Sequence, residues 1–489
     1  MKRYFLQRIR MSEKTLRVRF APAPTGMMHL GNIRTALMNY LIAQKQQGTL
    51  ILRIEDTDTE RNFDPKAEKI IEDLTWLSLD YQEGPVKGGP HVPYFQSQRN
   101  DLYQQELEKF ISHDKVYRCF CTTEELEKKR NRQIALKQPP RYDKTCLKLD
   151  KQASDTKAQS VPFIWRMKLD QTQQLTITDL SHGKITFDLK NFSDFPITRQ
   201  NGTVTFMFAN FVDDVLMEVT CAIRGEDHLT NTAGQAALYT AMNYTIPTFW
   251  HLPILCNIEG KKLSKRDFGF SLRDLKAAGY LPQAILNYLA LIGASFKEEI
   301  MSMKELIEAI DFNAPSATGQ IKYDVEKLRW VNHKWICKLP TETIAQLTRT
   351  YLEAAYPAVA TFSETQLIGL IGHIQKEMIT LEDSVKLLAF YFTDPVYEIA
   401  TLEQVVPAEK LALIKTIVHD ATTFTDPQVL LDTAKNNIKG TIVSPKELFS
   451  VLRYALMAST HGPSIHELIE MLGTTTCQKR FNNLLLLLP

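Results

Sequence analysis

Residues 15–58, TLRVRFAPAPTGMMHLGNIRTALMNYLIAQKQQGTLILRIEDTD, carry the clearest structural signal in this chain. Residues 16–20 alternate apolar and basic side chains, which is typical of a short strand. A loop with two prolines and a glycine follows, and apolar residues then recur at helical spacing from Ile33 to Leu41. An apolar run at 49–54, which ends at two carboxylates, indicates a second strand. Strand, loop, helix and strand in this order predict the beginning of a doubly wound α/β domain.

The pattern continues downstream and is then interrupted. Asp64-Pro65 is a helix-start signal, after which apolar residues keep the helical period as far as Leu77. Residues 101–200 differ in composition, with Lys and Glu dominating 124–137 and strand-like pieces at 163–169 and 185–189. Strand-like segments of the first kind return at 219–224 and 250–255. We therefore expect an insertion between two halves of one sheet, followed after about residue 330 by an almost entirely helical region.

Composition excludes several classes of protein. A chain of 489 residues suggests about three domains at ~150 residues each. It contains no apolar run of about 18 residues, so a membrane-spanning helix is not expected. Seven cysteines, an odd and scattered set, argue against a disulfide scaffold and for a reducing, cytoplasmic location. Charges interrupt the basic segment 1–14, so we expect a disordered tail or a start codon misassigned upstream of Met11, and not a targeting signal.

The first motif with chemical meaning is FAPAPTGMMHLGN at residues 20–32, which joins the first strand to the first helix. A helix N-terminus offers unpaired amide donors and a positive dipole end, both of which suit phosphate. Gly26 and Gly31 let a backbone approach a ligand closely, and His29 could donate to a phosphate oxygen. From this segment alone, a simple turn in which His29 caps the helix stays equally open.

The second motif is GKKLSKR at residues 260–266, which follows an apolar strand. Four cations in so short a run are often only a solvated surface. These cations, however, follow a strand end in an α/β protein, which is where ligands bind. Lysine is a flexible point charge that suits phosphate oxygens, and nucleotidyl transfer chiefly needs such charge stabilisation.

Together, the two motifs resemble the HIGH and KMSKS signatures of class I aminoacyl-tRNA synthetases. The sequence His29-Leu-Gly-Asn32 corresponds to HIGH, and Lys262-Leu-Ser-Lys-Arg266 corresponds to KMSKS. The sequence between the two motifs resembles that of bacterial glutamyl-tRNA synthetases in four places, which are RIEDTD at 53–58, VDD at 212–214, IRGEDH at 223–228 and NT at 231–232. The resemblance covers residues from about 16 to 300 and is weaker at 449–463, where STHGP ends the segment.

The resemblance implies an α/β fold with a Rossmann-type doubly wound catalytic domain, an inserted α+β acceptor-binding domain and a C-terminal all-α anticodon-binding domain. We expect an N-terminal extension at 1–14 and the first catalytic half at 15–100. The insertion then spans 101–200, and the second catalytic half, with a stem-contact region, spans 201–330. The helical anticodon-binding domain spans 331–489. The expected protein is a cytoplasmic monomer that binds no membrane.

The reaction implied by the resemblance has two steps and uses ATP with Mg²⁺. The L-glutamate α-carboxylate attacks the α-phosphorus of ATP, which gives glutamyl-adenylate and pyrophosphate. A ribose hydroxyl of tRNA(Glu), the 2′-hydroxyl in this class, then attacks the activated carbonyl and releases AMP. The sequence leaves open whether tRNA(Gln) is charged as well, because the residues that read the anticodon cannot be placed.

Site residues follow from the same resemblance, motif by motif. Catalytic roles fall on His29 and Lys265. The ATP-binding set is Pro22, Pro24, Thr25, Gly26, His29, Gly31, Asn32, Asp227, His228, Lys262, Leu263, Ser264, Lys265 and Arg266. The substrate-binding set is Arg19, Glu55, Phe206, Asn210 and Arg224. Arginine is a natural partner for a substrate carboxylate, and Glu55 suits the substrate ammonium.

Two positions depart from the family pattern in this expected glutamate pocket. The family usually has Ser where this chain has Ala23, and Tyr where this chain has Phe206. Each change removes one hydroxyl. The loss of one neutral hydrogen bond costs only about 0.5–1.5 kcal/mol when no partner is left buried and unpaired. The departures therefore affect the geometry of the pocket and not the reaction.

A third constellation lies in the insertion, where Cys119, Cys121, Tyr142 and Cys146 could form a structural Zn²⁺ site. Some glutamyl-tRNA synthetases and their relatives bind zinc in this region with similar spacing. A family histidine two residues after the last cysteine is Lys148 here, so Tyr142 would be the fourth ligand. The alternative is a set of ordinary reduced cysteines, because only three strong ligands are visible.

Four other functions compete with this interpretation. A truncated relative that glutamylates a modified tRNA base lacks the anticodon-binding part, whereas this chain has a long helical tail. Glutaminyl-tRNA synthetases carry C-terminal β-barrels, which this tail does not resemble. A small-molecule nucleotidyltransferase with a HIGH motif needs neither the insertion nor the tail. A catalytically dead paralogue is disfavoured because His29, Arg224 and Lys265 are all present.

We predict that Lys265→Ala cripples adenylate formation and leaves the fold intact. Loss of one preorganised positive charge at the phosphates should cost on the order of 2–4 kcal/mol of transition-state stabilisation. Pyrophosphate exchange in the presence of tRNA measures the step, and a mutant rate near the wild-type rate would contradict the role of Lys265.

Overall fold

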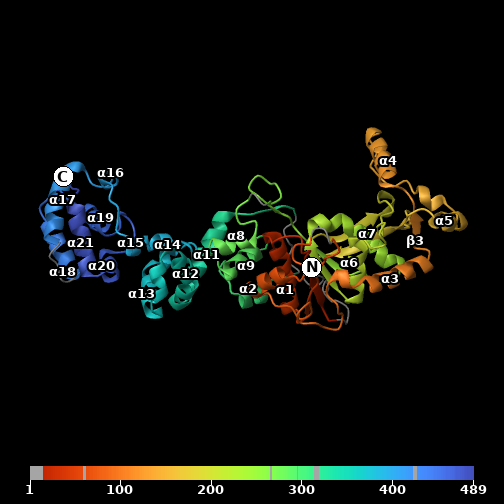
Figure 1. The fold of residues 1–489 in the computed structure, drawn as a ribbon, viewed down its shortest axis with the longest axis horizontal. Helices are drawn as coiled ribbons and strands as arrows, with labels where there is room; N and C mark the ends of the chain where they lie inside the picture. Colours follow the sequence, from red (N-terminus) through yellow and green to blue (C-terminus); the bar gives the residue numbers. More distant parts are fainter. Residues whose placement is uncertain are drawn as a thin grey trace, which may run out of the picture. The chain divides into compact units, whose positions relative to one another are not determined.

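A computed structural model describes residues 15–58, 62–264, 267–294, 296–312, 319–421 and 427–488 (Figure 1). The expected extension at 1–14 lies outside these residues, as do Lys265 and Arg266. The chain forms two compact units, one of residues 1–276 with 282–328 and the other of residues 277–281 with 329–489. Within the described ranges, no helix has the length and apolar character needed to cross a membrane.

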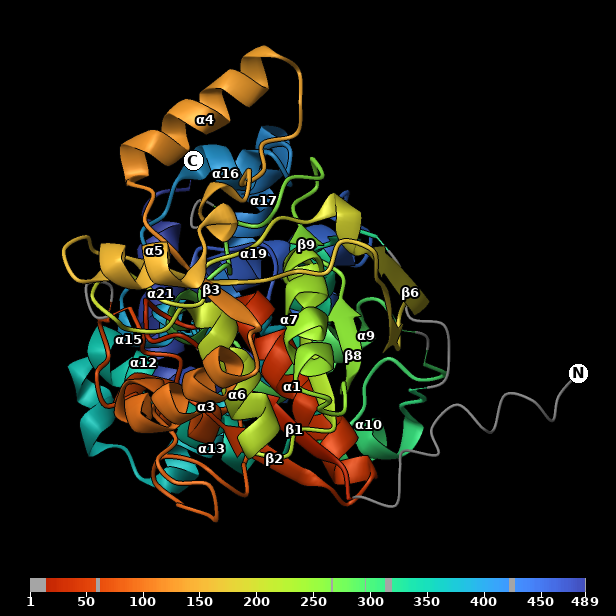
Figure 2. The ribbon, with the colours of Figure 1, turned by 90° about the vertical axis from the view of Figure 1, so that its right-hand side faces the viewer.

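The first unit is built on parallel strands, as the sequence predicts. β1 (Arg17–Phe20) pairs in parallel with β2 (Thr49–Leu52), and α1 (Leu30–Lys45) connects them. On the other side of β1 lies β7 (Cys221–Gly225), which pairs in parallel with β8 (Thr248–Leu252). α1 packs against β1, β2 and β7, and Figure 2 shows α1 beside β1 and β2. The carboxyl ends of β1, β7 and β8 therefore meet near the N-terminus of α1.

A strand of the insertion joins this sheet. β5 (Gln174–Asp179) pairs antiparallel with β6 (Gly183–Asp188) and in parallel with β8, where Asp179 lies opposite Phe249. Residues in β5 alternate between exposed and buried along its whole length, so one face of the hairpin packs inward. The insertion is thus connected to the catalytic sheet by backbone pairing as well as by the covalent chain.

The remaining elements of the expected insertion include a second strand pair. β3 (Val116–Cys119) pairs antiparallel with β4 (Ile164–Met167). The helices of this region are α3 (Asn100–Ser112), α4 (Thr123–Ala135) and α5 (Lys151–Ala158), with a short 3-10 turn η3 (Thr145–Lys148). No residue of α4 or α5 is buried, so both helices present mostly solvated faces.

One helix begins later than its sequence signal. Asp64-Pro65 predicts a helix start, but α2 spans Glu68–Trp76, because Ala67 has a left-handed backbone with φ of 55°. Asp64 nevertheless acts on this helix, since its carboxylate accepts from the amides of Glu68 at 3.0 Å and Ile70 at 3.3 Å. A helix was therefore predicted correctly after Asp64-Pro65, whereas its start was wrong by three residues.

The second half of the first unit completes the core. Its helices are α6 (Phe206–Leu216), α7 (Leu229–Ala241), α8 (Leu272–Ala277), α9 (Pro282–Leu291) and α10 (Met303–Ala309), with a 3-10 turn η5 (Glu226–His228) before α7. A further parallel pair is formed by β9 (Leu255–Cys256) and β10 (Ile321–Lys322). α6 and α7 contribute aromatic and aliphatic side chains to one apolar core that also includes residues of α3, β4 and β5.

The described residues of the second unit form helices and no strand, as the pattern after residue 330 predicts. Its elements are α11 (Val325–Lys338), α12 (Thr341–Ala355), α13 (Glu364–Ile374), α14 (Asp383–Leu387), α15 (Ala389–Phe392), α16 (Ile399–Glu403), α17 (Ala408–Ala421), α18 (Pro427–Asn437), α19 (Pro445–Met457), α20 (Ile465–Leu472) and α21 (Thr474–Leu485). The helices from α15 onward share one apolar core.

Candidate active site

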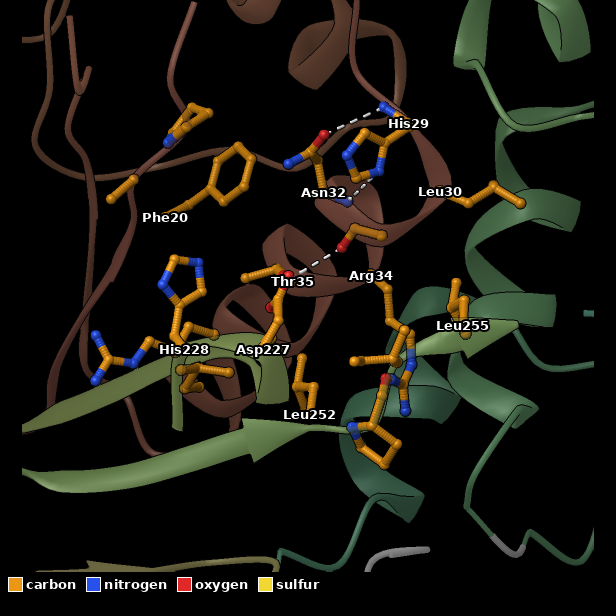
Figure 3. A pocket seen from close by; sticks show the side chains of 18 of the residues that line it. Phe20, His29, Leu30, Asn32, Arg34, Thr35, Asp227, His228, Leu252 and Leu255 are labelled. Carbon is orange, nitrogen blue, oxygen red and sulfur yellow. Dashed lines mark hydrogen bonds between the residues drawn. The ribbon is translucent and has the colours of Figure 1, made fainter. Parts of the chain in front are cut away.

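An open cavity of about 340 Å³ lies at the carboxyl ends of β1, β7 and β8, beside the N-terminus of α1 (Figure 3). Its position is the one at which open α/β sheets bind ligands. The predicted site residues that line it are Arg19, Pro22, His29, Gly31, Asn32, Glu55, Phe206, Asn210, Arg224, Asp227, His228, Lys262 and Leu263. Pro24, Thr25, Gly26 and Ser264 do not line the cavity, and Lys265 and Arg266 lie outside the described residues.

His29 caps α1 and still faces the cavity. Its Nδ1 accepts a hydrogen bond from the Asn32 amide at 3.3 Å, while the Asn32 side-chain oxygen accepts from the His29 amide at 3.3 Å. Figure 3 shows both of these hydrogen bonds between His29 and Asn32 as dashed lines. Since Nδ1 is an acceptor here, the proton of the neutral imidazole resides on Nε2. The capping role and the ligand role are therefore compatible, because each uses a different nitrogen.

Backbone hydrogen bonds join the segment after the GKKLSKR motif to the start of α1. Leu30 donates its amide to the Phe270 carbonyl at 3.1 Å, and Leu272 donates to the Met28 carbonyl at 3.0 Å. The Phe270 ring also stacks on the His29 ring, with centroids 4.9 Å apart. The two sequence motifs, more than two hundred residues apart, thus form one side of the cavity.

An ion pair joins the second motif to the start of α7. The Lys262 ammonium lies 2.8 Å from the Asp227 carboxylate, with both side chains about half exposed. Burial, followed by the positive charge of Lys262, lowers the pKa of His29, while Asp227 opposes the shift. His29 is consequently neutral near pH 7, which agrees with its role as an acceptor at Nδ1. The exposed Lys262–Asp227 pair itself contributes little to stability.

A buried charge cluster lies beneath the cavity. It consists of Arg19, Arg53, Glu55, Arg99, Asp213 and Asp214. Arg19 donates from Nε to both oxygens of Asp214 at 3.1 and 3.2 Å, and Arg53 donates to the same carboxylate at 2.7 Å. Arg99 donates to Asp213 at 2.6 Å. Three guanidinium groups therefore face three carboxylates, which is how buried charges are tolerated.

Glu55 belongs to this cluster but keeps one oxygen for a ligand. Its Oε1 accepts from Asn210 at 2.6 Å and from Arg53 at 3.1 Å, whereas no described residue donates to its Oε2. Burial raises the pKa of Glu55, and the neighbouring Arg53 and Arg19 counteract that effect. The carboxylate is thus ready to accept a cationic donor from the cavity.

Arg224 has the opposite character. It is buried, lines the cavity, and has no carboxylate of the described residues within ion-pair distance. Its Nη2 donates to the Thr232 hydroxyl at 2.6 Å. Burial, reinforced by the charge of Arg19, lowers the pKa of Arg224 to about 10, so it remains a cation at neutral pH. A buried cation without a counter-charge favours an anionic ligand.

Sequence reasoning missed two residues of the lining that have polar side chains. Arg34 and Thr35 line the cavity and lie one helical turn beyond Gly31, so helical spacing alone could have placed them on the same face. Arg34 donates to the Pro253 carbonyl at 3.0 Å, and burial lowers its pKa to about 10. Of the two departures, Phe206 lines the cavity, whereas Ala23 is exposed and does not line it.

The cysteines of the insertion converge at a separate place. The sulfurs of Cys119, Cys121 and Cys146 all lie within 4.8 Å of one another. The Tyr142 hydroxyl lies 3.3 Å from the Cys119 sulfur and 3.8 Å from the Cys121 sulfur. Lys148, at the position of the family histidine, is exposed. The four predicted donors are therefore brought together.

Comparisons with known families place both units. The family described as tRNA synthetases class I (E and Q), catalytic domain, matches residues 15–330. An anticodon binding domain matches residues 343–485. The chain is similar to the glutamate--tRNA ligases of Bacillus licheniformis and Bacillus subtilis, with 36% identity over 483 residues and 35% over 485. Each alignment covers 96% of this chain and 99% of the relative.

Solved structures of glutamate--tRNA ligases also match this chain. The crystal structure of a glutamate tRNA ligase from Elizabethkingia meningosepticum, in complex with its amino acid, matches with a TM-score of 0.87 and 29% identity. That alignment covers 97% of this chain and all of the other (100%). A glutamate-tRNA synthetase from Elizabethkingia anophelis matches with a TM-score of 0.85 and 29% identity, over 96% of this chain and 99% of the other.

We predict that Lys262→Met raises the pKa of His29. The substitution removes a nearby positive charge that disfavours the imidazolium and leaves the Asp227 carboxylate to favour it. A pH titration of labelled histidine by NMR measures the shift. Lys261→Met is the matched control, because the Lys261 ammonium pairs with Glu259 at 2.8 Å. An unchanged His29 pKa in Lys262→Met would contradict the electrostatic coupling across the cavity.

Proposed function

Since this chain belongs to the class I tRNA synthetases for glutamate and glutamine, we propose that it ligates L-glutamate to tRNA(Glu) at the expense of ATP. One observation carries the proposal. The same cavity is lined by Arg224, a buried cation without a described carboxylate partner, and by Glu55, a carboxylate with one oxygen to which no described residue donates. Such a cavity complements an amino acid whose side chain carries its own negative charge.

The glutamate is proposed to lie between these two groups. Its ammonium donates to Oε2 of Glu55, whose other oxygen already accepts from Arg53 and Asn210. Its side-chain carboxylate faces Arg224, with Arg19 as the neighbouring cation. Glutamine would bring only a neutral amide, which would leave the Arg224 charge unpaired in a buried site. The same geometry therefore selects the acid over the amide.

ATP is proposed to bind along the HLGN turn, entering as its Mg²⁺ complex, in which the metal neutralises part of the phosphate charge. The amide donors at the start of α1 and the Nε2 proton of His29 face the phosphates. Lys262, on the other motif, adds a positive charge near the same place. We extend this role to Lys265 on the sequence motif, since that residue lies outside the described ranges.

In the first step, an oxygen of the glutamate α-carboxylate attacks the α-phosphorus, and the bond to pyrophosphate breaks. The negative charge that moves onto pyrophosphate is stabilised by these donors and cations, with no covalent enzyme intermediate. In the second step, the 2′-hydroxyl of the terminal tRNA ribose attacks the activated carbonyl, and AMP leaves. The protein's contribution to both steps is positioning and charge stabilisation.

The tRNA is proposed to bind to two of the expected domains. Residues 101–200 receive its acceptor end, and the helical region 331–489 receives its anticodon arm. In this proposal the chain works as a cytoplasmic monomer. Aminoacylation measured separately with tRNA(Glu) and tRNA(Gln) tests the identity of the acceptor. Charging of both would make the enzyme non-discriminating, and charging of neither would contradict the proposed function.

We further propose that Cys119, Cys121, Cys146 and Tyr142 hold a structural Zn²⁺. Zinc thiolate bonds of about 2.3 Å in a tetrahedron place two sulfurs roughly 3.8 Å apart. The Cys121 and Cys146 sulfurs already lie 3.7 Å apart, and the Tyr142 hydroxyl completes the set. When bound, the metal would tie β3 to the turn η3. The three thiols would supply most of the affinity, because a phenol gives up its proton reluctantly.

Substituting Arg224 tests the glutamate pocket. We predict that Arg224→Gln lowers kcat/KM for glutamate by a factor that corresponds to a loss of roughly 2–4 kcal/mol in transition-state stabilisation, since the substrate carboxylate loses its charged partner. The KM for ATP should stay close to that of the wild type. Pyrophosphate exchange with tRNA present measures both constants. Arg349→Gln, which alters a partly exposed pair with Glu353 in the second unit, is the control. Equal losses for glutamate and ATP would show that Arg224 has no specific role.

Elemental analysis tests the zinc proposal. Protein purified without chelator should carry about one Zn²⁺ per chain, and Cys146→Ser should release it. Cys337→Ser, at an exposed cysteine on α11, should leave the metal content unchanged. Chelation should loosen the insertion, seen by proteolysis, before it affects ATP binding. Substoichiometric metal together with full activity would mean that apolar packing alone holds the insertion.

A further inference from the structure

Arg224 is held in place entirely by neutral groups. Its Nη2 donates to the Thr232 hydroxyl at 2.6 Å, and its Nε donates to Nε2 of His251 at 3.4 Å. Its guanidinium also lies over the Phe249 ring, 5.1 Å from the centroid. Thr232 and His251 are fully buried. This arrangement differs from that of Arg19, whose Nε is paired directly with the Asp214 carboxylate at 3.1 Å.

The protonation of His251 is determined by its other partner. Nδ1 of His251 lies 2.6 Å from a carboxylate oxygen of Asp179, which also accepts the His251 backbone amide at 3.1 Å. Burial lowers the pKa of His251 although the Asp179 hydrogen bond opposes it, so the ring is neutral. A carboxylate can only accept, and therefore Nδ1 carries the proton and Nε2 is an acceptor. The Asp179 contact thus presents Nε2 to Thr232 and Arg224.

The hydrogen bonds consequently run in one direction. Arg224 donates from Nη2 to the Thr232 hydroxyl, whose proton has two acceptors within reach, Nε2 of His251 at 2.8 Å and the His228 carbonyl at 3.1 Å. His251 then donates from Nδ1 to Asp179. The negative charge of Asp179 is separated from the guanidinium by His251 along the Nε contact, and by Thr232 and His251 along the Nη2 contact. Arg224 is therefore oriented by neutral hydrogen-bond acceptors, while none of the described carboxylates pairs with its positive charge.

Asp179 is itself rigidly held. It is the last residue of β5, and it is buried opposite Phe249 in the pairing of β5 with β8. Its second carboxylate oxygen accepts from the amides of Ser181 at 2.9 Å and His182 at 2.8 Å. Although burial opposes the shift, hydrogen bonds from His251 and His182 keep the pKa of Asp179 below its ordinary value. The carboxylate is ionised, fixed, and supplied by the inserted segment.

We propose that Asp179 and His251 are positioning residues that determine specificity for a carboxylate side chain over an amide. They orient Arg224 without neutralising it, so the full charge of Arg224 acts on the substrate. The inference rests on the proposed function, because it deepens the glutamate pocket. A directly bound carboxylate at Arg224 would compete with an anionic substrate, whereas a neutral acceptor does not. Neither residue lines the cavity, so both act through Arg224 and Thr232.

The test uses the full chain with its tRNA and compares glutamate with glutamine in pyrophosphate exchange. The Asp179 carboxylate accepts hydrogen bonds at both of its oxygens. Asp179→Asn replaces one oxygen by an NH2 group, which donates, so at least one of the present donors loses its acceptor. We expect KM for glutamate to rise roughly ten- to hundredfold and KM for ATP to change less than about twofold. The preference for glutamate over glutamine should fall. Asp188→Asn, in the same hairpin beside Lys190, should behave like the wild type.

Two further comparisons separate positioning from simple stability. His251→Gln can still donate to Asp179 and accept from Thr232, so it should retain more glutamate preference than His251→Leu. In an Arg224→Gln background, Asp179→Asn should add almost nothing to the glutamate KM, because the residue through which it acts is gone. Circular dichroism and an active-site titration report the folded fraction.

The outcomes are distinguishable. Wild-type protein without glutamate-dependent exchange would overturn the proposed function itself. Active wild type, with Asp179→Asn and His251→Leu variants that keep the wild-type glutamate KM and preference, would overturn only the positioning role. Additive effects of Asp179→Asn and Arg224→Gln, or an equal loss for glutamate and ATP, would show that the network merely supports the fold.

Discussion

Asp213 and Asp214, adjacent carboxylates on α6, are the point from which the site is built. They are buried and bind Arg19 on β1, Arg53 just after β2 and Arg99 at the start of α3. Removing one partner of such a pair typically costs about 3–5 kcal/mol, because a buried charge is left alone. The strand ends that surround the cavity therefore cannot move independently. Glu55 is held through Arg53, and Arg19 is held against β7.

Around this cluster, single side chains serve two purposes by dividing their atoms. His29 uses Nδ1 to cap α1 and keeps Nε2 for the cavity. Glu55 uses Oε1 for structure and keeps Oε2 for a ligand. This division keeps ligand-binding atoms in place before any ligand arrives, because the structural half of each side chain fixes its orientation. Preorganisation of this kind reduces the reorganisation that substrate binding and reaction would otherwise require.

Local patterns in the sequence predicted much of this. The alternation at 16–20, the helical spacing from Ile33 and the helical tail correspond to β1, α1 and the second unit. The separated motifs placed most of the lining, because loops at strand ends meet in this kind of fold. The start of α2 was wrong, since the left-handed conformation of Ala67 has no sequence signal of its own. Asp179 and His251 could not be found either, because their contact depends on how β5 pairs with β8.

That pairing also limits how the chain could be divided. Since β5 lies in the expected insertion and meets β8 at the Asp179–Phe249 pair, excision of residues 101–200 would remove the partners of two backbone groups of β8, the Phe249 carbonyl, which accepts the Leu180 amide at 2.9 Å, and the His251 amide, which donates to the Asp179 carboxylate at 3.1 Å. Exposed strand edges recruit strands from other molecules, and natural sheets protect them for that reason. A minimal catalytic core made by such a deletion would be prone to aggregation as well as incomplete. The end of β5 is thus part of the sheet edge beside β8, and a deletion that removed it would expose that edge.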